Sequence, residues 1–207
     1  MGLFIVSGAL TLYASQLRNS KRILADMKLH QELRLTSELI SRQLRNSGYW
    51  SGALNGTVSG TDGSLPPQNA YANVTTLSDG SGIVFQQNYD ADNIVNSAEI
   101  LGFRLNNGII QSQLGSNNWQ DLTDPKSIQI NNFVLTPHIN VVSSTTASAS
   151  FSPCSKICTD INTCPKISIR SYNILISAQA PSDSSIQRAL EHTVKIRNDQ
   201  ISGVCPA

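Results

Sequence analysis

Charged side chains are scarce in this sequence. Asp, Glu, Lys and Arg make up 14% of the 207 residues, and the formal net charge is +1. A protein that binds nucleic acid usually presents a basic face to the phosphate backbone. Asn, Ser, Thr and Gln are abundant instead. The composition therefore argues against a nucleic-acid partner and favours one modest exported domain.

Recognised catalytic motifs are also missing. The histidines, His30, His138 and His192, have no Ser-x-Gly elbow or cysteine partner nearby in a known motif. No stretch matches the glycine-rich loop that cradles phosphate. Residues 90–93 resemble the start of a calcium loop, but its glycine and closing glutamate are missing, which favours an Asx-rich turn. We therefore expect no catalytic residue, no metal and no cofactor, and the chain is not predicted to be an enzyme.

The sequence lacks an apolar run of full membrane-spanning length. Residues 1–14 carry no charge, and the first charged residue is Arg18. A helix over those residues would be about 21 Å long, whereas the ~30 Å hydrocarbon core of a membrane needs about 20 residues. Three interpretations are open: a cleaved signal peptide, a buried core helix, and a membrane helix whose upstream part is missing from this sequence. The third is favoured, because no basic residue precedes the run and the helical pattern continues past it. Met1 would then be an internal methionine or a misassigned start.

Helix breakers are absent from a long N-terminal stretch. After Gly8, no glycine or proline occurs until Gly48, so residues 1–48 are predicted to form one helix. Its membrane half covers residues 1–14, and its amphipathic half covers residues 17–47. At ~1.5 Å per residue this helix would be roughly 70 Å long, which exceeds what the core of a small domain needs.

Apolar residues recur every three or four positions in the amphipathic half, which marks one face of a helix. They are Leu29, Leu33, Thr36, Ile40 and Leu44, and Leu35 and Leu39 are predicted to widen this face. We expect the face to pack against a folded head, with helix–head contacts made by Leu33, Ile40 and Leu44.

Residues 49–207 are predicted to form this head, mostly from β-strands. The clearest local signal lies in residues 98–122, which read as a strand, an Asn-Asn-Gly turn and a returning strand. Further strands are expected at residues 74–77, 83–87, 128–142, 167–180 and 190–196. The predicted fold class is α+β, with a long N-terminal helix packed on a mainly antiparallel, meandering β-sheet.

The four cysteines lie in the last third of the chain. They are Cys154, Cys158, Cys164 and Cys205. In an exported head they suggest two disulfides, for which three connectivities are possible. A link from Cys205 to the cluster would tie down the C-terminus, and the cysteine that pairs with it cannot be read from the sequence. A zinc site is the competing interpretation, but intervals of three and five residues followed by a distant fourth cysteine do not match the usual paired ligands.

Two phrases give the chain a resemblance to a known family. The first is at the end of the predicted helix and consists of Leu39, Arg42, Leu44, Arg45, Gly48 and Tyr49. The second is at the end of the last predicted strand and consists of Val194, Arg197 and Asn198. Together with the apolar helix and the strand–Asn-Asn-Gly–strand unit, this order resembles the PilW family of type IV minor pilins. It resembles more broadly the GspJ pseudopilins of type II secretion. The family's prepilin peptidase site and early glutamate are absent from this sequence, and we expect a fragment or a wrongly assigned start.

The resemblance implies a pilin-like fold and a structural function. It implies an inner-membrane protein with a single-pass helix and a periplasmic head, where disulfides form. It further implies partners among the other minor pilins, the major pilin and the inner-membrane assembly machinery, with a role in priming the pilus and capping its tip. The residues expected to make helix–helix contacts in the fibre are Leu3, Phe4, Ile5, Val6, Leu10 and Leu12.

Three other functions stay open at this point. A GspJ-type pseudopilin of type II secretion is an alternative in the same class. A membrane-anchored periplasmic binding domain would use the helix only as an anchor, and its head would contain a concave apolar pocket. An enzyme is the weakest alternative.

Overall fold

One long helix and a two-sheet β head make up the structure. The computed structural model describes residues 2–53, 69–143, 159–160 and 162–203. Helix α1 covers Gly2–Arg45, and the strands follow it in the chain. This arrangement confirms the predicted α+β, pilin-like class. The helix begins and ends close to the predicted limits of residues 1–48, because nothing between Gly8 and Gly48 interrupts it.

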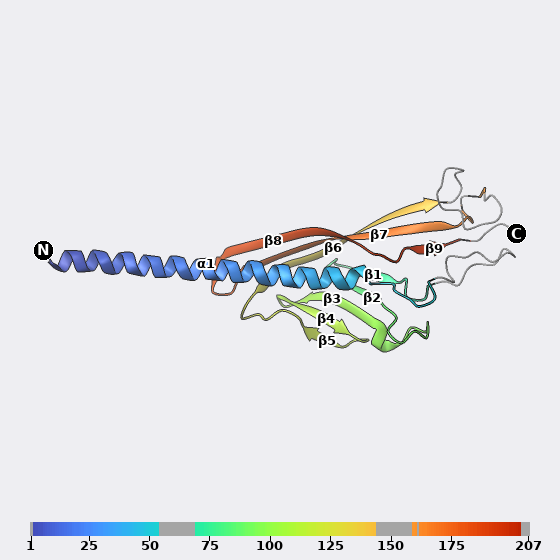
Figure 1. The fold of residues 1–207 in the computed structure, drawn as a ribbon, viewed down its shortest axis with the longest axis horizontal. Coiled ribbons are helices and arrows are strands. Elements are labelled where there is room, and N and C mark those ends of the chain that lie inside the picture. The colour runs from blue at the N-terminus through green and yellow to red at the C-terminus, as the bar shows by residue number, and fades with distance from the viewer. Residues whose placement is uncertain (1, 54–68, 144–158, 161, 204–207) are drawn as a thin grey trace.

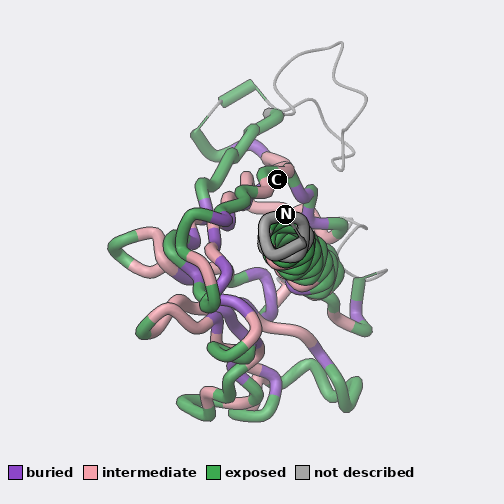
Figure 2. Tube along the Cα trace, turned by 90° about the vertical axis from the view of Figure 1, so that its left-hand side faces the viewer, coloured by how far each residue is buried: buried purple, intermediate pink, exposed green. Residues whose placement is uncertain are grey.

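Helix α1 extends well beyond the head. Its N-terminal half projects from the β structure, and its C-terminal half lies along the head (Figure 1). In the view along the helix, the projecting turns are exposed and the buried residues gather among the strands (Figure 2). The first fully buried apolar side chain of α1 among the described ones is Leu29.

The first sheet has five antiparallel strands in the order β1-β2-β3-β4-β5. Their bounds are Val74–Thr76, Gly82–Gln86, Ile100–Asn106, Ile109–Leu114 and Trp119–Asp121. The predicted Asn-Asn-Gly turn joins β3 to β4. Asn107 and Gly108 both have positive φ, at 51° and 77°, as a tight two-residue hairpin turn requires.

The second sheet is built from long strands. Strand β6 (Gln129–Ser143) pairs with β7 (Lys166–Ala180), and β7 pairs with β8 (Asp183–Lys195). The short β9 (Gln200–Ser202) pairs with the start of β7. All of these pairs are antiparallel. Strand β8 is therefore an edge strand beside the helix.

The core forms where the helix and the two sheets meet. Helix α1 contacts β8 and β7, and β6 contacts β2, β3 and β4 of the first sheet. Aromatic residues Phe85, Phe103 and Phe133 and the helix residues Leu29 and Ile40 are buried in one cluster. Burial of this single cluster holds the helix and both sheets together.

Three sequence predictions differ from the structure. The strands form two sheets, where one meandering sheet was expected. Strand β8 begins at Asp183, seven residues before the predicted start, because residues 181–182 alone form the turn. Leu35 and Leu39 were expected to widen the packed face of α1, but both are exposed. The head covers a narrower strip of the helix than the apolar pattern suggested.

Candidate interaction surfaces

Helix α1 carries large apolar side chains that the head does not cover. Its members are the exposed large side chains Leu10, Leu12, Tyr13, Leu17, Ile23, Leu24, Met27, Leu35 and Leu39. We call this set the outer apolar surface of α1. Leu24 is 66% exposed and Leu35 is 55% exposed, whereas Leu33, two residues from Leu35, is 2% exposed. Exposed apolar side chains gathered along one element indicate a surface that binds something.

The residues expected to make helix–helix contacts lie at the projecting end of α1. Residues 3–6 are helical, but their side chains lie outside the described ones. Leu10 and Leu12 are exposed. Over the described residues, no helix is both long and apolar enough to cross a membrane.

Leu33, Ile40 and Leu44 lie on the side of the helix that faces the head and belong to the buried core cluster. Ser37 and Ser41 are also buried on this side. Ser41 donates a hydrogen bond to the carbonyl of Ser37 at 2.7 Å, a common way for a buried helical serine to satisfy its hydroxyl.

The two sequence motifs on which the family resemblance rests contact each other at the end of the helix. The backbone N–H of Arg197 donates to the carbonyl of Arg45 at 3.1 Å. The side-chain amide of Asn198 donates to the carbonyl of Ser47 at 3.0 Å. Helix carbonyls left without a partner at the C-terminus need such donors, so the end of the β8 segment caps the helix.

Arg170 on β7 reinforces the same junction. It is 5% exposed, and its guanidinium donates to the carbonyl of Ala72 and, at 3.0 Å, to the carbonyl of Asn198. Burial lowers the pKa of Arg170 below its ordinary value. The arginine thereby joins both sheets to the segment that caps α1.

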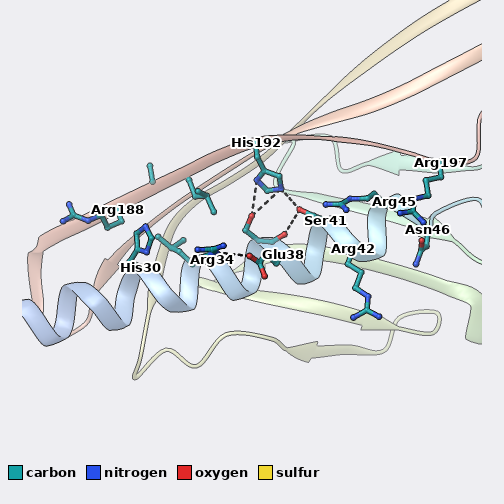
Figure 3. A pocket seen from close by; sticks show the side chains of 14 residues that line it. His30, Arg34, Glu38, Ser41, Arg42, Arg45, Asn46, Arg188, His192 and Arg197 are labelled. Atoms are coloured by element: carbon teal, nitrogen blue, oxygen red, sulfur yellow. Dashed lines mark hydrogen bonds and ion pairs between the residues drawn. The ribbon is translucent and has the colours of Figure 1, made fainter.

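A groove of about 950 Å³ opens between the C-terminal half of α1 and strand β8 (Figure 3). His192 points from β8 towards the helix, where its ring nitrogens meet the hydroxyls of Ser37, at 3.1 Å, and of Ser41. Burial, with a smaller contribution from the charge of Arg45, lowers the pKa of His192 below its ordinary value of 6.5. Because both serines are 3% exposed, this cluster holds strand to helix and offers no accessible nucleophile. Sequence reasoning missed this cluster, because both serines lie about 150 positions from His192.

An acidic cluster lies in the first sheet's connections. Carboxylate oxygens of Asp90, Asp92 and Glu99 lie within 4.8 Å of one another. Glu99 is 1% exposed and accepts hydrogen bonds from the backbone N–H groups of Tyr89 and Asn96, at 2.9 and 3.0 Å. Although burial raises the pKa of Glu99, these backbone donors and the hydroxyl of Tyr71 together outweigh it and hold the pKa below its usual range. The glutamate thus has protein donors and organises the turn.

Cys164 lies just before β7. It is fully buried and disulfide-bonded. Cys154, Cys158 and Cys205 lie outside the described residues.

The comparison with protein families identifies the chain's relatives. The family model described as PpdB, prepilin peptidase-dependent protein B, matches residues 22–196. The chain belongs to the prepilin peptidase-dependent protein B family. It is therefore a pilin-related protein that is associated with the pilin assembly machinery. Neither a curated protein nor a solved structure matches it.

The matched range places the family relationship mainly in the head. It covers the packed half of α1 and extends through strand β8 to Ile196. The apolar residues before residue 22 lie outside the match. The PilW resemblance is more specific than this family relationship.

Proposed function

We propose that this protein is a minor pilin of PilW type that primes type IV pilus assembly and sits at or near the pilus tip. The observation that carries the proposal is that α1 packs on the head with one side and exposes large apolar side chains elsewhere. Leu33, Ile40 and Leu44 attach one side of α1 to the head, while the outer apolar surface stays uncovered over most of its length. The family match supports a pilin-related protein.

The mechanism is assembly through helices. The projecting half of α1 bundles with the helices of neighbouring subunits, where small residues such as Gly8 allow close approach. Leu24 and Leu35 extend the contact towards the head, because both are exposed. The heads then pack side by side around this bundle.

The location follows from the same proposal. Helix α1 holds the protein in the inner membrane before assembly, and the head lies in the periplasm. A disulfide-bonded Cys164 agrees with an oxidising compartment. The partners are the other minor pilins, the major pilin and the inner-membrane assembly machinery, and the protein has no enzymatic activity.

Mass spectrometry of the native N-terminus tests this function most directly. The protein is recovered from a sheared pilus fraction and from membranes. We expect a mature chain that starts upstream of Met1 with an N-methylated hydrophobic residue followed closely by a glutamate. A native chain that starts at Met1 would contradict assembly by this route, and the membrane-anchored binding domain would replace it.

A gene deletion distinguishes the pilus from type II secretion. For a minor pilin, the deletion strain should lose surface pili and keep its secreted enzymes. A GspJ-type pseudopilin would give the reverse result. The groove gives little support to the binding domain, because it lies between helix and head and is lined by charged residues.

A further inference from the structure

The groove between α1 and β8 has a strongly basic lining. Among the residues that the structure describes, five arginines line it, and Glu38 supplies the one carboxylate of the lining. Arg34 pairs with Glu38 at 2.9 Å. Arg188 pairs with Asp26, just outside the groove, at 2.7 Å. The carboxylates of Glu38 and Asp26 are therefore already paired.

Three guanidinium groups remain available. They belong to Arg42, Arg45 and Arg197, which lie at the end of the groove nearest the C-terminus of α1 (Figure 3). All three are exposed, and none has an acidic partner among the residues that the structure describes. Guanidinium groups bind carboxylates and phosphates through paired hydrogen bonds. The site is thus built for an anionic partner.

Strand β8 gives the groove a free backbone edge. It is the last strand of its sheet on the described path β6-β7-β8. The N–H of Ile196 donates to the carbonyl of Arg170, so even-numbered residues of β8 pair with β7 by hydrogen bonds in this register. The backbone groups of Ala189, Glu191 and Thr193 therefore point to the outer edge. An extended peptide can add to such an edge as a further strand.

We infer that this groove binds an extended, acidic segment of another protein chain, which pairs with the edge of β8 and places carboxylates on Arg42, Arg45 and Arg197. The site goes beyond the proposed function, because assembly through the outer apolar surface does not use it.

Other anionic partners fit the groove less well. A small anion would fill only a fraction of about 950 Å³. Lipid head groups are remote, since His30 at the near end lies 16 residues beyond Ala14, or about 24 Å along the helix. Single-stranded nucleic acid usually stacks its bases on aromatic side chains, and the lining residues include no Phe, Tyr or Trp.

Fluorescence anisotropy with a labelled peptide tests the inference on the full chain in detergent. The probe is a peptide of about nine residues that alternates Glu with Val, long enough to follow β8. The triple variant R42Q/R45Q/R197Q should bind it at least about tenfold more weakly, because charge-assisted pairs are lost. The matched variant R18Q/K28Q/K126Q removes the same charge outside the groove and should stay within about twofold of the wild type.

A second probe tests the strand pairing without changing the protein. The same peptide carries N-methyl groups at alternate residues, on the N–H groups that would pair with β8. Its binding should weaken by at least about tenfold, because main-chain hydrogen bonds supply affinity in strand addition. Methylation of the other set of residues is the control and should change binding little.

Three results would overturn the inference. The first is equal binding of the probe to the wild type and to R42Q/R45Q/R197Q. The second is equal loss from both methylation patterns. The third is tighter binding of inorganic phosphate, anionic vesicles or oligothymidylate than of the acidic peptide. None of these results depends on whether the protein assembles into a pilus.

Discussion

The side-chain amide of Asn198 donates a hydrogen bond to the carbonyl of Ser47 at 3.0 Å, across 151 positions of sequence. Its own carbonyl accepts from the buried guanidinium of Arg170. Asn198 thus links the end of α1 to the middle of the second sheet. The helix end, the last strand segment and β7 are held as one unit, which fixes the direction in which α1 leaves the head.

Replacing Asn198 with Ala should loosen this junction. The variant removes the donor to Ser47 and keeps the backbone carbonyl that Arg170 uses. Loss of one such hydrogen bond should lower the free energy of unfolding by about 1 kcal/mol. Chemical denaturation measures the change. Asn140→Ala, at an exposed position on β6, is the control, and an equal effect of both variants would contradict the assigned role.

Arg170→Met should lower the free energy of unfolding by more than Asn198→Ala does. The methionine keeps much of the side-chain volume but leaves the carbonyls of Ala72 and Asn198 without their buried donor. Because hydrogen bonds to charged groups are stronger than neutral ones, we expect a loss of roughly 3 kcal/mol. Arg188→Met, which breaks an exposed pair with Asp26, should change stability by less than about 1 kcal/mol. Thermal unfolding of the two variants gives the comparison.

The helix and the hairpin could be predicted because their signals are local. An uninterrupted stretch up to Gly48 specifies a helix, and Asn107-Gly108 specifies a tight turn. The division into two sheets could not be predicted, because it depends on which face of β6 meets β2, β3 and β4. The exposure of Leu35 has the same origin, since the helix pattern alone does not tell how wide a strip the head covers.

The groove could not be predicted from the sequence either, because its lining residues are far apart in the chain. Arg42 and Arg45 were read as parts of a family phrase, and His192 as an isolated histidine. Their common site exists only because β8 returns along the helix. Contacts between positions about 150 residues apart leave no periodic or motif signal in one sequence.

Leu33 and Leu35 provide a matched pair for the two sides of the helix. Leu33 is buried in the core and Leu35 is exposed. Leu33→Ala should lower the free energy of unfolding by about 3 kcal/mol because it leaves a cavity, whereas Leu35→Ala should change it by less than about 0.5 kcal/mol. Under the proposed function, Leu35→Glu should nevertheless reduce the number of surface pili. Normal piliation with Leu35→Glu would show that this part of the outer apolar surface is not used.

His192 should make stability depend on pH. Because its pKa is lowered in the folded protein, the unfolded chain binds the proton more tightly. The contribution that neutral His192 makes to the free energy of unfolding is then fully present above its ordinary pKa of 6.5. It is lost as the pH falls below that value. The melting temperature of His192→Gln should therefore fall less between about pH 7.5 and pH 5 than that of the wild type. His138→Gln, at an exposed position of β6, should follow the wild type.

Peptide mapping without reduction should find Cys164 linked to Cys205. Strand β9 is antiparallel to β7, with Ser202 opposite Lys166. Beyond it, a Cβ on Gly203 would overlap the carbonyl of Cys164, so this backbone already passes the buried cysteine, and Cys205 follows two residues later. Disulfide formation needs Cα atoms within about 7 Å, so a cysteine that follows Gly203 closely in the chain is the expected partner. Cys205→Ser should then lower stability by about 2–4 kcal/mol, and a Cys154–Cys164 or Cys158–Cys164 peptide would contradict the assignment.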